Sequence, residues 1–216
     1  MKKASLFILA FFFLLVGCTQ KQKKQPITEE PDYTQYVDPF IGTAYTGHTF
    51  PGATYPLGMI QAGPETGNYS WEYCAGYVYG DSLINGFSQT RLNGTGCIDL
   101  GDLLIQPFSG DKREDLRSKY DLVSEDASPG YYTVKLTDND VHVEISAAPH
   151  VAFHKYTFGE GKTANILADF QSGLVWTEDK IHTHVLENEV NFENKKTISG
   201  YTRRKEWVER MYYFVI

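Results

Sequence analysis

"GYYTVKLTDNDVHVEISAAPHVAFHKYTFGEGKTANILADF", residues 130–170, decides the fold class of this chain. Apolar and polar residues alternate along it, and the alternation breaks at "DND" and "GEGK". A period of two is typical of β-strands, and Gly, Asn and Asp clusters are typical of the turns between them. The stretch therefore predicts consecutive antiparallel strands.

The segment "VHVEI" shows how these strands meet their surroundings. Val141, Val143 and Ile145 share one face, while His142 and Glu144 share the other. Such a strand has one face in a core and one face in water, as in many antiparallel sheets.

More strands are expected on both sides of this segment. "VAFHKYTF" (151–158) and "TANILADF" (163–170) continue the pattern, and "HTHVLENEVNF" (182–192) predicts a hairpin that turns around Glu187–Asn188. Repeated strands at this spacing predict an all-β fold, an antiparallel β-sandwich, over residues 36–216.

Composition limits the possible partners. The 216 residues are 42% hydrophobic, 22% charged and 14% aromatic, which suits a globular chain with one real core. Lys and Arg number 20 against 27 Asp and Glu, a formal net charge of -7. No basic surface is expected to follow a phosphate backbone, so nucleic acid is excluded as an expected partner.

Two other segments bear on organisation. Residues 109–126, "SGDKREDLRSKYDLVSED", have the charge density of a short helix or a solvated loop. The chain ends in "RMYYFVI" (210–216), which has strand character and no polar residue after it. We expect the sandwich to be truncated at this end; the alternative is a final edge strand that closes it.

The N-terminal sequence "MKKASLFILAFFFLLVGC" has two lysines, an apolar run and a small residue before Cys18. This is the layout of a secretory signal, and it is short for a membrane span. Its "LVGC" resembles a bacterial lipobox, whose cysteine receives a lipid; alternatively Cys18 is incidental in an ordinary signal. We predict a signal peptide over residues 1–17, lipid attachment at Cys18 and a polar, flexible tether over 18–35. The predicted location is the cell envelope, lipid-anchored at the periplasmic face of the outer membrane.

Residues 38–107 are the expected functional region. Gly and Pro recur every few residues, as in "GHTFPGATYPLGMIQAGPET" (47–66), so the backbone makes repeated tight bends. Loops of this kind on a rigid scaffold commonly carry binding residues.

Aromatic side chains in this region suit a sugar ligand. The side chains of Trp71, Tyr73, Tyr77 and Tyr79 offer flat faces with polar edges, which match the apolar face and hydroxyl rim of a hexose. Tyr77 and Tyr79 are two residues apart and are expected to share a face of one strand. The competing interpretation, that these rings fill core volume, is favoured by composition alone.

Carboxylates are numerous in these loops, but the sequence does not show which two of them could act as a catalytic acid and base. Inverting glycoside hydrolysis needs an acid and a base roughly 6.5–9.5 Å apart. An Asp beside a Gly, as in "DLGD", more often accepts backbone hydrogen bonds in a turn. The candidates are Asp38, Glu65, Glu72, Asp81, Asp99 and Asp102.

Histidines and cysteines leave alternatives open. His182 and His184 are spaced for a metal on one strand face, but no third ligand accompanies them, so a solvated face is favoured and no metal ligand is assigned. His48, in "TGHTFPG", can hydrogen-bond a ligand hydroxyl or its own turn backbone. Cys74 and Cys97 either pair in an oxidising compartment or remain buried thiols.

Several motifs together carry a family resemblance. They are "VDPFIGT" (37–43), "GHTFPGATYPLGMIQAGPET" (47–66), "WEYCAGYVYGDSLINGFSQTRLNGTGCIDLGDLLIQP" (71–107) and "FHKYTF" (153–158). In this order they resemble the N-terminal part of glycoside hydrolase family 92, the calcium-dependent exo-α-mannosidases of gut bacteria. The resemblance covers residues 36–216.

The resemblance implies a β-sandwich followed by an (α/α)₆ barrel domain that this chain lacks, with the active site between them. It implies calcium as cofactor and inverting removal of terminal α-mannose from mannose-containing glycans, α-1,2-mannosidase-like, with the acid, the base and most calcium ligands in the barrel. No catalytic residue is carried over, and this chain alone is expected to be inactive. The residues expected to line the sugar pocket are His48, Trp71, Glu72, Tyr73, Cys74 and Arg91.

One departure from the family pattern concerns specificity. The family often shows "GFSHTHLSGTG" where this chain has "GFSQTRLNGTG", so Gln89 and Arg91 replace two histidines. If these side chains reach the pocket, the preferred linkage is expected to differ. The alternative to an enzyme part is a stand-alone carbohydrate-binding lipoprotein with Trp71 and Tyr73 as its stacking platform.

Overall fold

The computed structural model describes residues 31–56, 58–67, 70–111, 115–175, 185–207 and 209–216. Residues 33–216 form one compact unit. The predicted signal peptide, Cys18 and most of the predicted tether lie outside the described residues and stay predictions.

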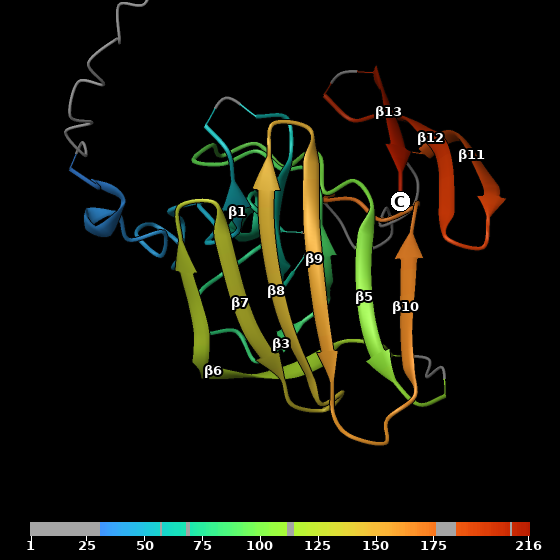
Figure 1. Ribbon diagram of the computed structural model, residues 1–216. Coiled ribbons are helices and arrows are strands. Elements are labelled where there is room, and N and C mark those ends of the chain that lie inside the picture. Colours follow the sequence, from blue (N-terminus) through green and yellow to red (C-terminus); the bar gives the residue numbers. More distant parts are fainter. Residues whose placement is uncertain (1–30, 57, 68–69, 112–114, 176–184, 208) are drawn as a thin grey trace, which may run out of the picture. The chain divides into compact units, whose positions relative to one another are not determined.

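The described chain is built from antiparallel strands (Figure 1). Short 3₁₀ helices are η1 (Thr34–Tyr36) and η2 (Trp71–Tyr73). The strands are β1 (Ala53–Thr54), β2 (Gln61–Glu65), β3 (Leu83–Ile84), β4 (Gly86–Ser88), β5 (Leu104–Ser109), β6 (Ser118–Ser128), β7 (Tyr131–Leu136), β8 (Val141–Ala148), β9 (Val151–Phe158), β10 (Ala164–Asp169), β11 (Val185–Asn194), β12 (Thr197–Lys205) and β13 (Glu209–Val215).

Two five-stranded sheets form the sandwich. Their strand orders are β1-β2-β4-β5-β10 and β3-β6-β7-β8-β9. Figure 1 shows β6 to β9 as neighbouring strands of one sheet, and β11-β12-β13 as a separate three-stranded sheet in red. The predicted all-β sandwich is confirmed; the additional three-stranded sheet was not predicted.

The main core lies between the two five-stranded sheets. Phe87 on β4 and Tyr132 on β7 bring their ring centroids to 6.3 Å, and both side chains are fully buried. Val141, Val143 and Ile145 on β8 complete the same cluster, as their alternation predicts. Apolar burial at about 25 cal/mol per Å² is the main force that holds the sheets together.

Two expectations about local structure are wrong. Residues 118–128 form β6, paired with β3 and β7, and not a helix or loop. Most of its side chains remain exposed or half-buried, so its charge density marks solvent contact and not helical structure. β11 runs unbroken through Glu187–Asn188 and turns at Lys195–Lys196; the ladder shifts register between Val185 and Glu187, as in a bulge.

The sandwich predicts opposite outcomes for one substitution on two neighbouring strands. Val143→Thr on β8 places a hydroxyl at a site with 0% exposure, and we expect a loss of about 1–3 kcal/mol in unfolding free energy. Val151→Thr on β9, at 61% exposure, is expected to change it by less than about 0.5 kcal/mol. Urea unfolding measures both, and equal losses would contradict the assignment of faces.

Candidate functional site

An exposed loop cluster forms around η2. Trp71 is 46% exposed, and its indole N–H donates to the Gly96 carbonyl at 3.1 Å. The His48 ring meets the indole edge to face, with centroids 4.5 Å apart and planes at 85°. These contacts fix the indole while they leave part of its apolar surface in solvent.

His48 itself is held in an unusual backbone conformation. Its φ is +55°, a region that few residues other than glycine adopt, and its carbonyl accepts a 2.6 Å bond from the Gly94 N–H. The side chain is 6% exposed, and its Nε2 has no hydrogen-bond partner among the described residues. A buried ring nitrogen without a partner can accept or donate one bond to a ligand.

Glu72 and Tyr73 extend the cluster. The Ser70 hydroxyl donates to the Glu72 carboxylate at 2.5 Å, and this bond lowers the pKa of Glu72 below its usual value. The Tyr73 hydroxyl donates to Asp81 at 2.9 Å. Glu72 is exposed and Tyr73 half-buried, so an ionised carboxylate and a phenol lie beside the exposed indole.

The other two tyrosines of this stretch, Tyr77 and Tyr79, differ in their exposure to solvent. Tyr79 is 47% exposed, whereas Tyr77 is buried and donates to the Glu125 carboxylate at 3.0 Å. Neither residue is in a strand, so the predicted shared strand face is wrong. The repeated Gly residues bend the backbone here and remove the period on which that prediction rested.

Cys74 lies behind the exposed cluster. Its side chain is fully buried, and its thiol donates to the Trp71 carbonyl at 2.9 Å. Burial raises the pKa of Cys74 to about 11, so this thiol stays protonated near neutral pH. Cys97 is half-buried, and both cysteines are free thiols.

Arg91 also lies behind the cluster, in the interior. Its guanidinium is 1% exposed and stacks over the Phe50 ring, 4.4 Å from the centroid. It donates to the carbonyls of Pro64 at 3.0 Å and Ala75 at 2.5 Å, and to the Ser88 hydroxyl at 2.5 Å. Arg91 thus joins separate loops and presents no charge at the surface.

Gln89, the other departure from the family pattern, is internal as well. It is 6% exposed, its amide donates to the Phe87 carbonyl at 2.8 Å, and its Oε1 lies 3.0 Å from Nε2 of His154. The side chains of Gln89 and Arg91 are therefore both buried and hydrogen-bonded in the interior.

Beside Arg91 lies a buried carboxylate. Glu65 is 0% exposed, and the nearest oxygen–nitrogen distance to Arg91 is 4.0 Å. Burial raises the pKa of Glu65 to about 7, and the opposing effect of Arg91 does not cancel it.

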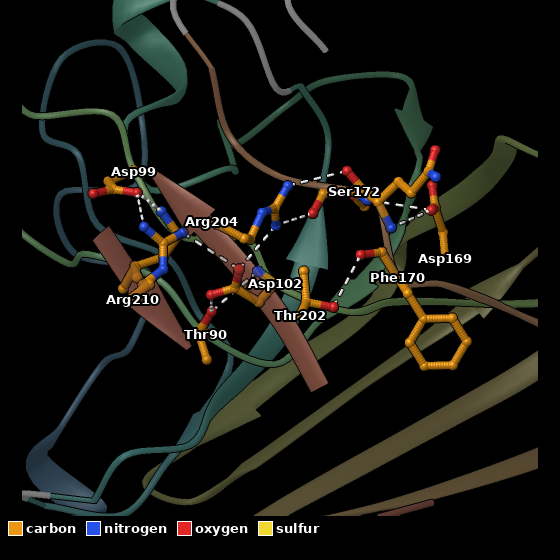
Figure 2. Close-up of polar contacts among 11 residues, drawn as sticks. Thr90, Asp99, Asp102, Asp169, Phe170, Ser172, Thr202, Arg204 and Arg210 are labelled. Carbon is orange, nitrogen blue, oxygen red and sulfur yellow. Dashed lines mark hydrogen bonds and ion pairs between the residues drawn. The ribbon is translucent and has the colours of Figure 1, made fainter. Parts of the chain in front are cut away.

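An ion-pair network joins the loop of Asp99 and Asp102 to β12 and β13 (Figure 2). Arg204 on β12 donates to Asp102 at 2.8 Å, and Arg210 on β13 lies 3.3 Å from the same oxygen and 2.6 Å from Asp99. Thr90 donates to the second oxygen of Asp102 at 2.8 Å. Burial acts to raise the pKa of Asp102, but Arg210 and Arg204 outweigh it and lower that pKa below its usual value.

Arg204 also secures the segment after β10. Its guanidinium donates to the carbonyls of Ser172 and, at 3.0 Å, Gln171. A Cβ at Gly173 would lie 2.4 Å from Nη2 of Arg204, so only glycine admits this approach.

The loop that carries the two aspartates is strained. Leu100, Gly101 and Leu103 have φ values of +67°, +75° and +56°. Such conformations cost on the order of 1–3 kcal/mol each in residues with a side chain, and surrounding contacts must hold them. Asp99 accepts a backbone bond from Leu100 at 2.7 Å, as the "DLGD" turn predicts. The ion pair between Asp99 and Arg210, which are 111 positions apart, has no signal in the sequence.

Trp207, which lies between β12 and β13, was not predicted as a site residue. Its indole N–H donates to the Ile98 carbonyl at 3.0 Å, and the residue is 60% exposed. A lone tryptophan in the charged run "RRKEWVER" (203–210) is the signal that could have identified it.

No metal site or membrane-spanning helix is found in the described ranges. There, no group of three or more His, Cys, Asp or Glu side chains is placed to hold an ion. Within those ranges, no helix is both long and apolar enough to cross a membrane. His182 and His184 lie outside them.

The fold and the loop cluster define a β-sandwich domain with exposed aromatic loops. Residues 36–216 match the model of the glycosyl hydrolase family 92 N-terminal domain. The chain belongs to this family.

Similar proteins agree with this assignment. A GH92 α-mannosidase from Bacteroides thetaiotaomicron, solved in complex with mannoimidazole, is 35% identical with a TM-score of 0.77 over 84% of this chain. A GH92 inverting mannosidase from Bacteroides thetaiotaomicron VPI-5482 is 25% identical with a TM-score of 0.59 over 80% of the chain. A protein of Arthroderma benhamiae called "Uncharacterized secreted glycosidase" is 32% identical over 65% of the chain.

These relatives are much longer than the region they share with this chain. The chain spans 20% of the Arthroderma protein and 24% and 22% of the two solved mannosidases.

The buried Glu65 predicts a pH-dependent stability. Between pH 4.5, the ordinary pKa of a Glu, and about 7, the folded chain keeps a proton that the unfolded chain loses. Stability due to this proton is present below pH 4.5 and lost as pH rises to about 7. We expect wild-type stability to fall by up to about 3 kcal/mol relative to Glu65→Gln across this window. Urea unfolding at several pH values measures it.

The control is Glu72→Gln, which removes an exposed carboxylate from the neighbouring loop. It should produce no comparable relative fall. Parallel pH profiles for wild type and Glu65→Gln would contradict the role given to Glu65.

Proposed function

We propose that this domain is the N-terminal part of an inverting exo-α-mannosidase that removes terminal α-mannose from glycans, with an α-1,2 preference. The observation that carries the proposal is the family match across residues 36–216. It is supported by similarity to one mannosidase solved with mannoimidazole and to another described as inverting.

In this proposal the loop cluster around η2 is one wall of the sugar pocket. Trp71 supplies an apolar face for a mannose ring, and the unpartnered Nε2 of His48 supplies one hydrogen bond. Glu72 and Tyr73 present polar atoms at the edge of the indole. Cys74 and Arg91 act from behind, since both are buried and hold the loops in place.

The proton-transfer groups are assigned to the barrel domain that the proposal places beyond this chain. Inversion needs an acid and a base on opposite faces of the sugar, roughly 6.5–9.5 Å apart. The resemblance to the family gives no carboxylate of this chain either role. Calcium is likewise proposed to be held outside the described residues, because these offer no suitable ligand cluster. When bound, calcium would supply positive charge to sugar oxygens.

The location proposed for the protein is the cell envelope. A lipid on Cys18 would anchor it to the periplasmic face of the outer membrane, and residues 18–35 would give it reach. The name of the Arthroderma relative, a secreted glycosidase, is consistent with export.

The test is hydrolysis of α-1,2-mannobiose by the full-length protein, followed by NMR of the first product. We expect β-mannose to appear first, as inversion requires, and no mannose release by residues 19–216 alone. Trp71→Ala in the full-length protein should lower kcat/KM about tenfold through lost stacking, and Trp71→Phe much less. First release of α-mannose, or no hydrolysis of any α-mannoside, would contradict the proposal.

A further inference from the structure

Two exposed tryptophans are tied to one short backbone segment. The Trp71 indole donates to the Gly96 carbonyl at 3.1 Å, and the Trp207 indole donates to the Ile98 carbonyl at 3.0 Å. The two acceptors are two residues apart, which spans at most about 7 Å of backbone. Both indoles are therefore bonded to the same three-residue segment, although 136 positions separate them in the sequence.

The position of Trp207 is fixed by its flanking residues. Its backbone N–H lies 3.4 Å from the Asp99 carboxylate, and Arg204 and Arg210, on either side of it in sequence, enter the buried network. The tip of the β12–β13 hairpin is thus held against the loop that also supports Trp71.

Exposure and surroundings indicate what Trp207 can bind. The residue is 60% exposed and its indole N–H is already bonded, so what it offers a ligand is an apolar face. Lys205 and Glu209, both exposed, flank it. A single aromatic face among charged groups suits one sugar ring, whose hydroxyls need polar partners, better than a protein partner, whose contact core is depleted of charge.

We propose that Trp207 is a second saccharide-binding residue, which stacks on a further mannose unit of the glycan whose terminal part contacts Trp71. This inference rests on the proposed function and extends it from a terminal sugar to a longer chain. Trp207 then favours tri- and longer saccharides over disaccharides without a part in bond cleavage.

The test measures the affinity of the full-length protein for sulfur-linked α-1,2-mannobiose and α-1,2-mannotriose, which resist hydrolysis. By calorimetry, Trp207→Ala should weaken the trisaccharide about tenfold and the disaccharide less than about twofold. Trp71→Ala should weaken both. Trp207→Phe keeps an aromatic face but loses the bond to Ile98, so it should retain trisaccharide affinity within about threefold.

Tyr213→Ala is the control, since Tyr213 is 72% exposed on the same hairpin but away from its tip. It should change neither affinity. If Trp207→Phe loses as much affinity as Trp207→Ala, Trp207 acts through the Ile98 bond and the inference is overturned. Unchanged trisaccharide affinity in Trp207→Ala, with both saccharides weakened by Trp71→Ala, overturns the inference and leaves the proposed function intact. If wild type binds neither saccharide, the proposed function fails.

Discussion

The buried pairing of Asp99 and Asp102 with Arg204 and Arg210 is the constraint on which the candidate site depends. It joins a strained loop near the middle of the chain to the two strands of the last hairpin. Buried pairs contribute little net stability against an apolar replacement, but removal of one partner costs about 3–5 kcal/mol, because it leaves a charge unpaired in the interior. The network therefore acts mainly to specify which segments meet. Its consequence is that Trp207 lies against the loop whose Gly96 carbonyl accepts the indole N–H of Trp71.

The sandwich core and the loops are stabilised by different kinds of contact. The sandwich core, from β4, β7 and β8, is built mainly from buried apolar side chains and supplies the frame. The loops are held instead by interior polar groups, with Arg91 as the centre of one set of bonds and Asp102 as the centre of the other. Such loops keep unusual backbone angles, as at His48 and Leu100, because several contacts hold each one.

Sequence reasoning was reliable where one local period decides the structure. Val141, Val143 and Ile145 are buried as their alternation predicts, since burial of one strand face leaves a direct mark on the sequence. It failed for residues 118–128, where the prediction relied on charge density instead of an alternating pattern. Polar residues indicate exposure to solvent and not backbone conformation. It also failed for the turn of β11 and β12, because Asn188 lies near a register shift and the turn follows seven residues later.

The candidate site was predictable only in part. The loops with His48 and Trp71 were identified by their Gly, Pro and aromatic residues, and the structure brings these two side chains together. The interior positions of Arg91 and Gln89 were not predicted, because charged and amide side chains are usually exposed at the protein surface. The place of Trp207 on the loop that also bonds Trp71 could not be predicted, because it depends on ion pairs between residues about a hundred positions apart.

A double-mutant cycle on Asp102→Ala and Arg204→Ala, measured by urea unfolding, tests the central constraint most directly. The account predicts that each single variant loses several kcal/mol, and that the double variant loses at least about 2 kcal/mol less than the sum of the two. Losses that add within about 0.5 kcal/mol would show that the two residues act independently, and would contradict the claim that their pairing fixes the hairpin against the loop.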